Sequence, residues 1–125
     1  MSRRLLIVDD SMLIRRMVGE TLVSDGWELA GEAGNGVEAV SKYKKLRPDA
    51  VTLDIIMPNS NGLQALREIL EFDPQAKVVV VSALNQTKLI SDAIRHGAYD
   101  FIAKPFMPDQ LQMTMRALVE DALPV

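Results

Sequence analysis

Five polar residues in this sequence follow short apolar segments, and their side chains are suited to phosphate or metal chemistry. Asp9 and Asp10 come after the first such segment. Asp54, Ser82 and Lys104 each come after a later one. If these segments are neighbouring parallel strands, their carboxyl ends meet at one edge of a sheet and the side chains converge there. The pattern therefore predicts a cluster of carboxylates with a hydroxyl group and a cation beside it.

Three aspartates crowded together would repel one another unless a cation lies among them. Mg²⁺ suits such a cluster because it takes oxygen ligands, keeps several waters and often binds a phosphate oxygen. Lys104 and the Ser82 hydroxyl would then surround a phosphoryl group on Asp54 with positive charge and a hydrogen-bond donor. Phosphoryl transfer onto Asp54 is the chemistry that this combination of residue types supports.

Each of these residues has a simpler explanation when it is taken alone. Asp10 could cap a helix, Asp54 could be a turn residue, and Lys104 could be a solvated surface lysine. These explanations do not account for compatible side chains at four segment ends that face one crevice. We therefore treat the residues as one candidate site.

The elements that must position this site alternate along the whole chain. The expected strands are Leu5–Val8, Glu28–Ala33, Ala50–Leu53, Lys77–Val81 and Asp100–Ala103. The expected helices comprise one with an apolar stripe from Ile14 to Leu22, one from Asn35 that stops before Pro48, Gly62–Phe72, Thr87–His96, and one that begins at Pro108. Glu38 stands three residues after Asn35, which is typical of a capping box.

Strict alternation of five strands and five helices predicts an α/β fold with a parallel sheet covered on both faces. Right-handed crossovers favour a doubly wound, flavodoxin-like (βα)5 arrangement with strand order 2-1-3-4-5. The 125 residues show no linker or repeat, so residues 1–125 are expected to form a single domain.

The composition limits the expected partners and location. A net charge of −3 gives no general attraction to nucleic acid or to anionic lipid. No apolar run is long enough to span a membrane, and the run after Arg3 and Arg4 is too short for a signal peptide. The absence of cysteines excludes disulfides and thiolate metal sites. We expect a cytoplasmic protein without nucleic-acid or membrane partners.

Four motifs together resemble the signature of response-regulator receiver domains, specifically the stand-alone chemotaxis type. The motifs are Leu5-Leu6-Ile7-Val8-Asp9-Asp10-Ser11, Asp54-Ile55-Ile56-Met57-Pro58 followed by Asn61-Gly62, Ser82-Ala83, and Phe101-Ile102-Ala103-Lys104-Pro105-Phe106. They occur in the family's order and spacing, and the resemblance covers almost the whole chain.

The resemblance implies a metal site and a phosphoacceptor. Asp54 would accept the phosphoryl group from a sensor histidine kinase. Asp9, Asp10 and Asp54 would bind Mg²⁺, with Mn²⁺ as a possible substitute, and the backbone carbonyl of Ile56 would complete the protein ligands.

The resemblance also implies a switch. Ser82 would be the switch hydroxyl, Phe101 the switch aromatic and Lys104 the phosphate-binding lysine, with a cis peptide bond before Pro105. Phosphorylation would change the surface formed by the fourth helix, fifth strand and fifth helix, which binds an output protein such as a flagellar motor switch component. The protein would be a regulator and not an enzyme. The alternative within the family is a receiver domain excised from a multidomain regulator with DNA-binding or enzymatic output.

Two apolar residues depart from the pattern of chemotaxis relatives. Ile56 and Leu84 occupy positions where polar groups often help to orient water, which predicts slow loss of the phosphoryl group. Ile56 also argues against an aspartyl-phosphate hydrolase, since such enzymes need a carboxylate two residues after the nucleophile. A flavin-binding module of the same fold is disfavoured because Asp9 and Asp10 would repel its phosphate.

Overall fold

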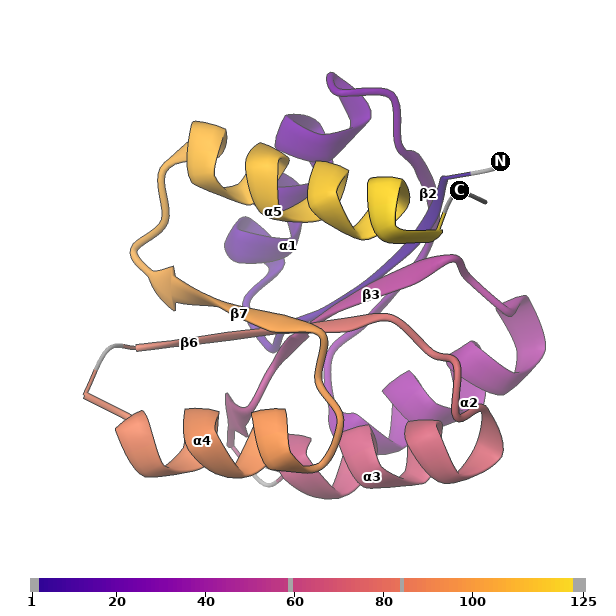
Figure 1. Ribbon diagram of the computed structural model, residues 1–125, viewed down its shortest axis with the longest axis vertical. Helices are drawn as coiled ribbons and strands as arrows, with labels where there is room; N and C mark the ends of the chain where they lie inside the picture. The colour runs from indigo at the N-terminus through magenta and orange to yellow at the C-terminus, as the bar shows by residue number, and fades with distance from the viewer. Residues whose placement is uncertain (1–2, 59, 84, 123–125) are drawn as a thin grey trace.

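The computed structural model describes residues 3–58, 60–83 and 85–122, and its centre is a five-stranded parallel sheet. The strands are β1 (Arg4–Val8), β2 (Glu28–Ala33), β3 (Ala50–Asp54), β6 (Val78–Ala83) and β7 (Asp100–Lys104), in the order β2-β1-β3-β6-β7. The helices are α1 (Met12–Val23), α2 (Gly36–Leu46), α3 (Gly62–Phe72), α4 (Thr87–Arg95) and α5 (Pro108–Ala122). Helices α1 and α5 cover one face of the sheet, and α2, α3 and α4 cover the other (Figure 1).

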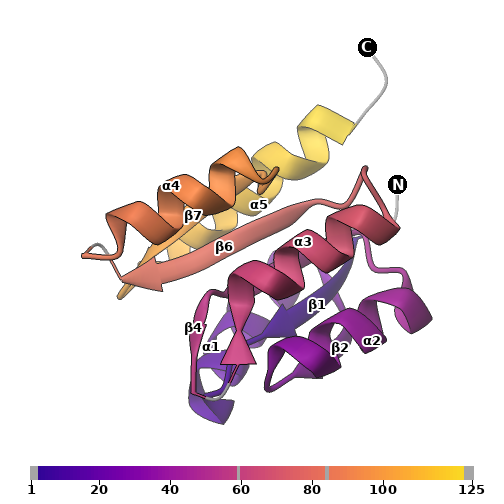
Figure 2. The ribbon, with the colours of Figure 1, turned by 90° about the horizontal axis from the view of Figure 1, so that it is seen from below.

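The predicted doubly wound topology is confirmed. β6 and β7 are the fourth and fifth strands of the large sheet, so the observed order corresponds to 2-1-3-4-5. The numbering is displaced because β4 (Ile56–Met57) and β5 (Ser60–Asn61) pair as a separate antiparallel ladder. This ladder was not predicted, since strands of two residues carry no hydrophobic period. Figure 2 shows it beside α3, below the carboxyl end of the sheet.

Alternate residues of the central strands pack into two hydrophobic cores. On β1, Leu6 and Val8 belong to the core beneath α2, α3 and α4, and Leu5 and Ile7 belong to the core beneath α1 and α5. All four side chains are almost completely buried, and burial of each contributes about 2 kcal/mol. These two cores fix the strand order and therefore the relative positions of the strand ends.

Local sequence signals determine where α2 and α3 begin. Asn35 caps α2, because its Oδ1 accepts a hydrogen bond from the Glu38 amide at 2.9 Å. The Glu38 carboxylate accepts from Asn35 Nδ2, whereas in a capping box it would accept from the Asn35 backbone amide. At the start of α3, a Cβ on Gly62 would lie 2.4 Å from the Cα of Ile55. Only glycine lets α3 approach the backbone just after Asp54 this closely.

The strand boundaries differ slightly from the prediction where chemistry was expected. β6 continues through Ser82 to Ala83, and β3 and β7 include Asp54 and Lys104 as their last residues. These residues are thus held by the sheet ladder itself. None of the described helices is long and apolar enough to cross a membrane.

Candidate metal and phosphoacceptor site

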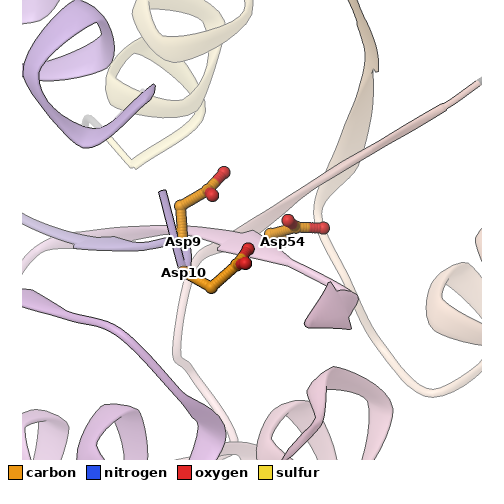
Figure 3. Close-up of side chains that lie close together, drawn as sticks. All are labelled: Asp9, Asp10 and Asp54. Carbon is orange, nitrogen blue, oxygen red and sulfur yellow. The ribbon is translucent and has the colours of Figure 1, made fainter. Parts of the chain in front are cut away.

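Three carboxylates meet at the carboxyl ends of β1 and β3, as predicted. One oxygen from each of Asp9, Asp10 and Asp54 lies within 4.8 Å of the others. Figure 3 shows these side chains together beside the ends of the two strands. Asp9 and Asp54 are buried, with 3% and 5% of their surfaces exposed, and Asp10 is exposed. The cluster therefore has a buried floor and an open side.

Backbone amide groups orient the two buried carboxylates. Oδ1 of Asp9 accepts a hydrogen bond from the Ser11 amide at 3.0 Å. Oδ1 of Asp54 accepts one from the Ile56 amide at 3.0 Å. The Ser11 hydroxyl in turn caps α1 by accepting from the Ile14 amide at 3.2 Å. One oxygen of each buried carboxylate is thus fixed by the turn that follows it.

Lys104 bridges the other oxygens of the same carboxylates. Its Nζ lies 2.8 Å from Oδ2 of Asp9 and 3.1 Å from Oδ2 of Asp54. The side chain of Lys104 is 27% exposed, whereas those of Asp9 and Asp54 are 4% and 6% exposed. The lysine comes from the end of β7, and the peptide bond between it and Pro105 is cis, as the family resemblance implied.

Burial and pairing shift the ionisation of this group. Burial raises the pKa of the Asp54 carboxyl, against the lowering effects of the Ile56 amide and Lys104, and the nearby charge of Asp9 raises it further. Burial alone would lower the pKa of Lys104, but its hydrogen bonds and charge interactions with Asp9 and Asp54 outweigh this and raise it. The lysine stays charged, and the ionised form of Asp54 carries a desolvation cost.

The oxygen donors fit a hard divalent cation. Three carboxylates face a single ammonium group, so two further positive charges, those of one divalent cation, would balance the cluster, and an all-oxygen set suits Mg²⁺ or Mn²⁺. The exposed side at Asp10 leaves room for the waters that Mg²⁺ retains. The cluster therefore has the ligand chemistry that the sequence predicted.

Two other predicted residues lie on the neighbouring strands. Ser82 is 1% exposed, and its hydroxyl has no hydrogen-bond partner among the described residues. Phe101 on β7 is 39% exposed. Ile56 is 46% exposed, and Leu84 lies outside the described residues. An unpartnered buried hydroxyl beside the cluster is available to a group that binds there.

Two polar residues near the site were not identified from the sequence. The Thr52 hydroxyl is buried without a described partner, two residues before Asp54 on the same strand. A threonine inside an otherwise apolar strand was the available signal. Arg15 donates a hydrogen bond to the Asp9 carbonyl at 2.7 Å. Its position one turn into α1 indicated a reach toward the preceding loop but did not specify this acceptor.

The comparisons with known proteins agree with this geometry. Residues 5–116 match the family model described as the response regulator receiver domain. The chain is 50% identical over 111 residues to the chemotaxis protein CheY of Thermotoga maritima, covering 89% of this chain and 92% of that protein. It is 48% identical to the CheY of Bacillus subtilis, with the same coverage.

Solved structures show the same likeness. CheY in the CheX–CheY–BeF3–Mg²⁺ complex from Borrelia burgdorferi has a TM-score of 0.89 and 36% identity, over 94% of this chain and 89% of that one. The family match, the relatives and the shared fold lead to one conclusion: this chain belongs to the response regulator receiver domain family, whose members are regulatory domains.

Proposed function

We propose that Asp54 accepts a phosphoryl group from a sensor histidine kinase in a Mg²⁺-dependent reaction. The observation that carries the proposal is the convergence of three carboxylate oxygens within 4.8 Å, with Lys104 against the Asp54 oxygen at 3.1 Å. Asp9, Asp10 and Asp54 would hold the cation, together with the backbone carbonyl of Ile56. The cation would supply positive charge for the oxygens of the transferring phosphoryl group.

The residues of the chain have separate tasks in this transfer. An Asp54 carboxylate oxygen forms the new bond to phosphorus as the bond from phosphorus to the kinase histidine breaks, and the histidine nitrogen leaves. The Ile56 amide holds the other Asp54 oxygen, so that the carboxylate keeps its orientation. Lys104 moves from bridging two carboxylates to pairing with a phosphoryl oxygen, which offsets charge that accumulates there.

The buried Ser82 hydroxyl provides a link from the phosphoryl group to a surface. Ser82 is paired with Ala103 across β6 and β7, beside the strand that carries Phe101 and Lys104. A hydrogen bond from this hydroxyl to a phosphoryl oxygen would draw the end of β6 toward Asp54, and Phe101 would change its packing. The surface of α4, β7 and α5 would then bind an output protein. Phe101 has no hydroxyl, so this output does not use a bond from an aromatic hydroxyl.

The relatives indicate the pathway. Several are chemotaxis proteins, and one forms a complex with CheX, so we propose a cytoplasmic chemotaxis regulator whose output partner is a protein such as a flagellar motor switch component. The length of the full gene product distinguishes this from a receiver domain in a longer regulator. Ile56 in place of a second carboxylate supports a regulator over an aspartyl-phosphate hydrolase.

Phosphoryl labelling tests the proposal. Incubation with acetyl phosphate and Mg²⁺ should add one phosphoryl group, detected as an intact mass, and EDTA should prevent the addition. Asp54→Asn should abolish labelling because it removes the negatively charged carboxylate oxygen that acts as the nucleophile. Asp73→Asn serves as a matched control, since Asp73 lies at the opposite end of the molecule, hydrogen-bonded to Tyr43, and labelling should be unchanged. Labelling of the Asp54→Asn variant at the wild-type rate would place the acceptor elsewhere.

A further inference from the structure

The side chain of Arg15 connects three elements at the edge of the site. Nη1 of Arg15 donates to the carbonyl oxygen of Asp9 at 2.7 Å, and Nε donates to Oε1 of Glu32 at 3.0 Å. Side chains on a helix tilt toward its amino terminus, so a residue one turn into α1 covers the loop before that helix. The Arg15 side chain is only 18% exposed. It thereby joins the end of β1, the first turns of α1 and the edge strand β2.

The Asp9 carbonyl lies just after the end of β1, where the chain turns into α1. The Asp9 amide still donates to the Ala33 carbonyl at 3.1 Å, but β2 ends at Ala33. Within the described parts of the chain, Arg15 is the donor to the Asp9 carbonyl. Because a peptide unit is planar, fixing this carbonyl also fixes the orientation of the amide of Asp10. The arginine therefore sets the direction from which the Asp10 side chain projects.

Asp10 depends on this contact more than the other two carboxylates. Asp9 is held by the Ser11 amide and Lys104, and Asp54 by the Ile56 amide and Lys104. No hydrogen bond or ion pair among the described residues engages the Asp10 carboxylate. Its placement therefore follows from the backbone, which Arg15 anchors.

An arginine suits this position better than a lysine. Its planar guanidinium presents donors in fixed directions, so one group can bond the Asp9 carbonyl and the Glu32 carboxylate together. Glu32 is 43% exposed, so the ion pair adds little stability by itself. Glu32 orients the guanidinium of Arg15. It also offsets the positive charge of Arg15, which would otherwise repel a divalent cation nearby.

We propose that Arg15, oriented by Glu32, is a positioning residue for the metal site. Its bond to the Asp9 carbonyl holds the loop of Asp9 and Asp10 in the orientation that binds the divalent cation. This inference rests on the proposed function, because it concerns the same cluster of carboxylates.

Calorimetric titration with Mg²⁺ tests the inference in the full chain. Arg15→Met should weaken Mg²⁺ binding about tenfold, the usual size of an effect from a residue that orients metal ligands. Arg15→Lys should also weaken it several-fold, because an ammonium group cannot reproduce the two fixed bonds. The control is Arg16→Met, which removes the same charge from the adjacent exposed position and should leave affinity within about twofold. Glu32→Gln, which keeps the arginine but removes its anchor, is used if Arg15→Met does not fold, and should weaken affinity a few-fold.

The Mg²⁺ dependence of acetyl phosphate labelling separates positioning from general damage. In Arg15→Met the half-saturating Mg²⁺ concentration should rise by the same factor as the dissociation constant. The rate at saturating Mg²⁺ should stay near that of the wild type. A loss in the saturated rate with no shift in half-saturation would overturn the positioning role.

The outcomes distinguish this inference from the proposed function. If the wild-type protein neither binds Mg²⁺ nor takes a phosphoryl group, the proposed function fails and the inference fails with it. If the wild type does both and Arg15→Met binds Mg²⁺ equally well, only the inference is overturned. Full affinity in Arg15→Lys, or an equal loss in Arg16→Met, would also overturn it, since charge would then explain the effect.

Discussion

Charged groups at the two ends of the central sheet differ in their partners. At the amino end, Arg4, Asp49 and Asp73 have hydrogen-bond partners within the protein. The Arg4 amide donates to the Asp49 carboxylate at 2.8 Å, and the Arg4 guanidinium donates to the Leu46 carbonyl at 2.7 Å. The Tyr43 hydroxyl donates to Asp73 at 2.7 Å. These contacts connect β1, α2 and α3 and give the charged groups hydrogen-bond partners within the protein.

At the carboxyl end, the charges are not balanced. Three carboxylates face one lysine, and the buried Ser82 hydroxyl has no described partner. Groups left unsatisfied in a folded protein lower its stability and commonly mark a site that binds something. The comparison supports the proposal that one end of the sheet maintains the fold and that the other end binds a cation and a phosphoryl group. Four substitutions, given in order of decreasing expected effect, test this difference.

Removal of the Lys104 ammonium group should have the largest effect on stability. Lys104→Met leaves Asp9 and Asp54 buried without a counter-charge, so the metal-free protein should lose about 3 kcal/mol of unfolding free energy. Saturating Mg²⁺ should restore much of this loss, because the cation takes over the neutralising role. Urea unfolding in EDTA and in Mg²⁺ measures both quantities. Lys88→Met, at an exposed position on α4, is the control and should change stability by less than about 0.5 kcal/mol in either condition. A loss for Lys104→Met that Mg²⁺ does not reduce would contradict the account.

Neutralising the Asp54 carboxylate should have the opposite effect and increase stability. Asp54→Asn should raise the unfolding free energy of the metal-free protein at neutral pH by about 1 kcal/mol. Burial raises the pKa of Asp54 in the folded protein above its ordinary value of 3.8, so the folded protein binds the proton more tightly than the unfolded chain does. The wild type therefore loses stability as pH rises from the ordinary pKa through the raised one. The variant has no carboxyl group at this position, so it does not show this loss.

Urea unfolding in EDTA across this pH range measures the difference between wild type and Asp54→Asn. The gain of the variant should be absent at the lowest pH, where Asp54 is protonated in both states, and should grow as pH rises. A gain that is constant with pH would show that ionisation of Asp54 is not its cause.

A substitution at the amino end should be insensitive to the cation. Tyr43→Phe removes the hydrogen bond to Asp73, which still accepts one from the Gln75 amide, and should cost about 1 kcal/mol. The loss should be the same in EDTA and in Mg²⁺, because this hydrogen bond lies at the end of the sheet away from the carboxylate cluster. A loss that depends on Mg²⁺ would show that the two ends are coupled through the sheet and would weaken the comparison.

The smallest effect concerns the lifetime of the phosphoryl group. Ile56 lies two residues after Asp54 and is 46% exposed. Its apolar side chain offers water no hydrogen bond. Ile56→Asn should therefore shorten the lifetime about threefold, or about 0.7 kcal/mol of barrier. Decay of the phosphorylated mass after donor removal measures it, with Val37→Asn as an exposed control on α2. Equal decay in wild type and both variants would show that Ile56 does not limit water attack.

The fold and the convergence of Asp9, Asp10 and Asp54 could be predicted because they follow from periodicity. Alternating apolar runs determine which segments are strands, and parallel topology places their carboxyl ends together. The link from Lys104 to both Asp9 and Asp54 could not be predicted, since the reach of a flexible side chain across strands has no sequence period. Because Arg15 lies one turn into α1, its side chain could be expected to lean toward the preceding loop, but the Asp9 carbonyl as its acceptor could not be predicted. The two-residue strands β4 and β5 could not be predicted because they are too short to show a hydrophobic period.

Calorimetric titration of the wild type and Asp9→Asn with Mg²⁺ tests whether a divalent cation binds among the three carboxylates at the carboxyl end of the sheet. The wild type should bind one Mg²⁺ weakly, and Asp9→Asn should bind it at least about tenfold more weakly, because one anionic ligand is lost. Asp49→Asn, at the amino end, should bind like the wild type. Equal Mg²⁺ affinity in the wild type and Asp9→Asn would contradict the assignment of this cluster as the metal site.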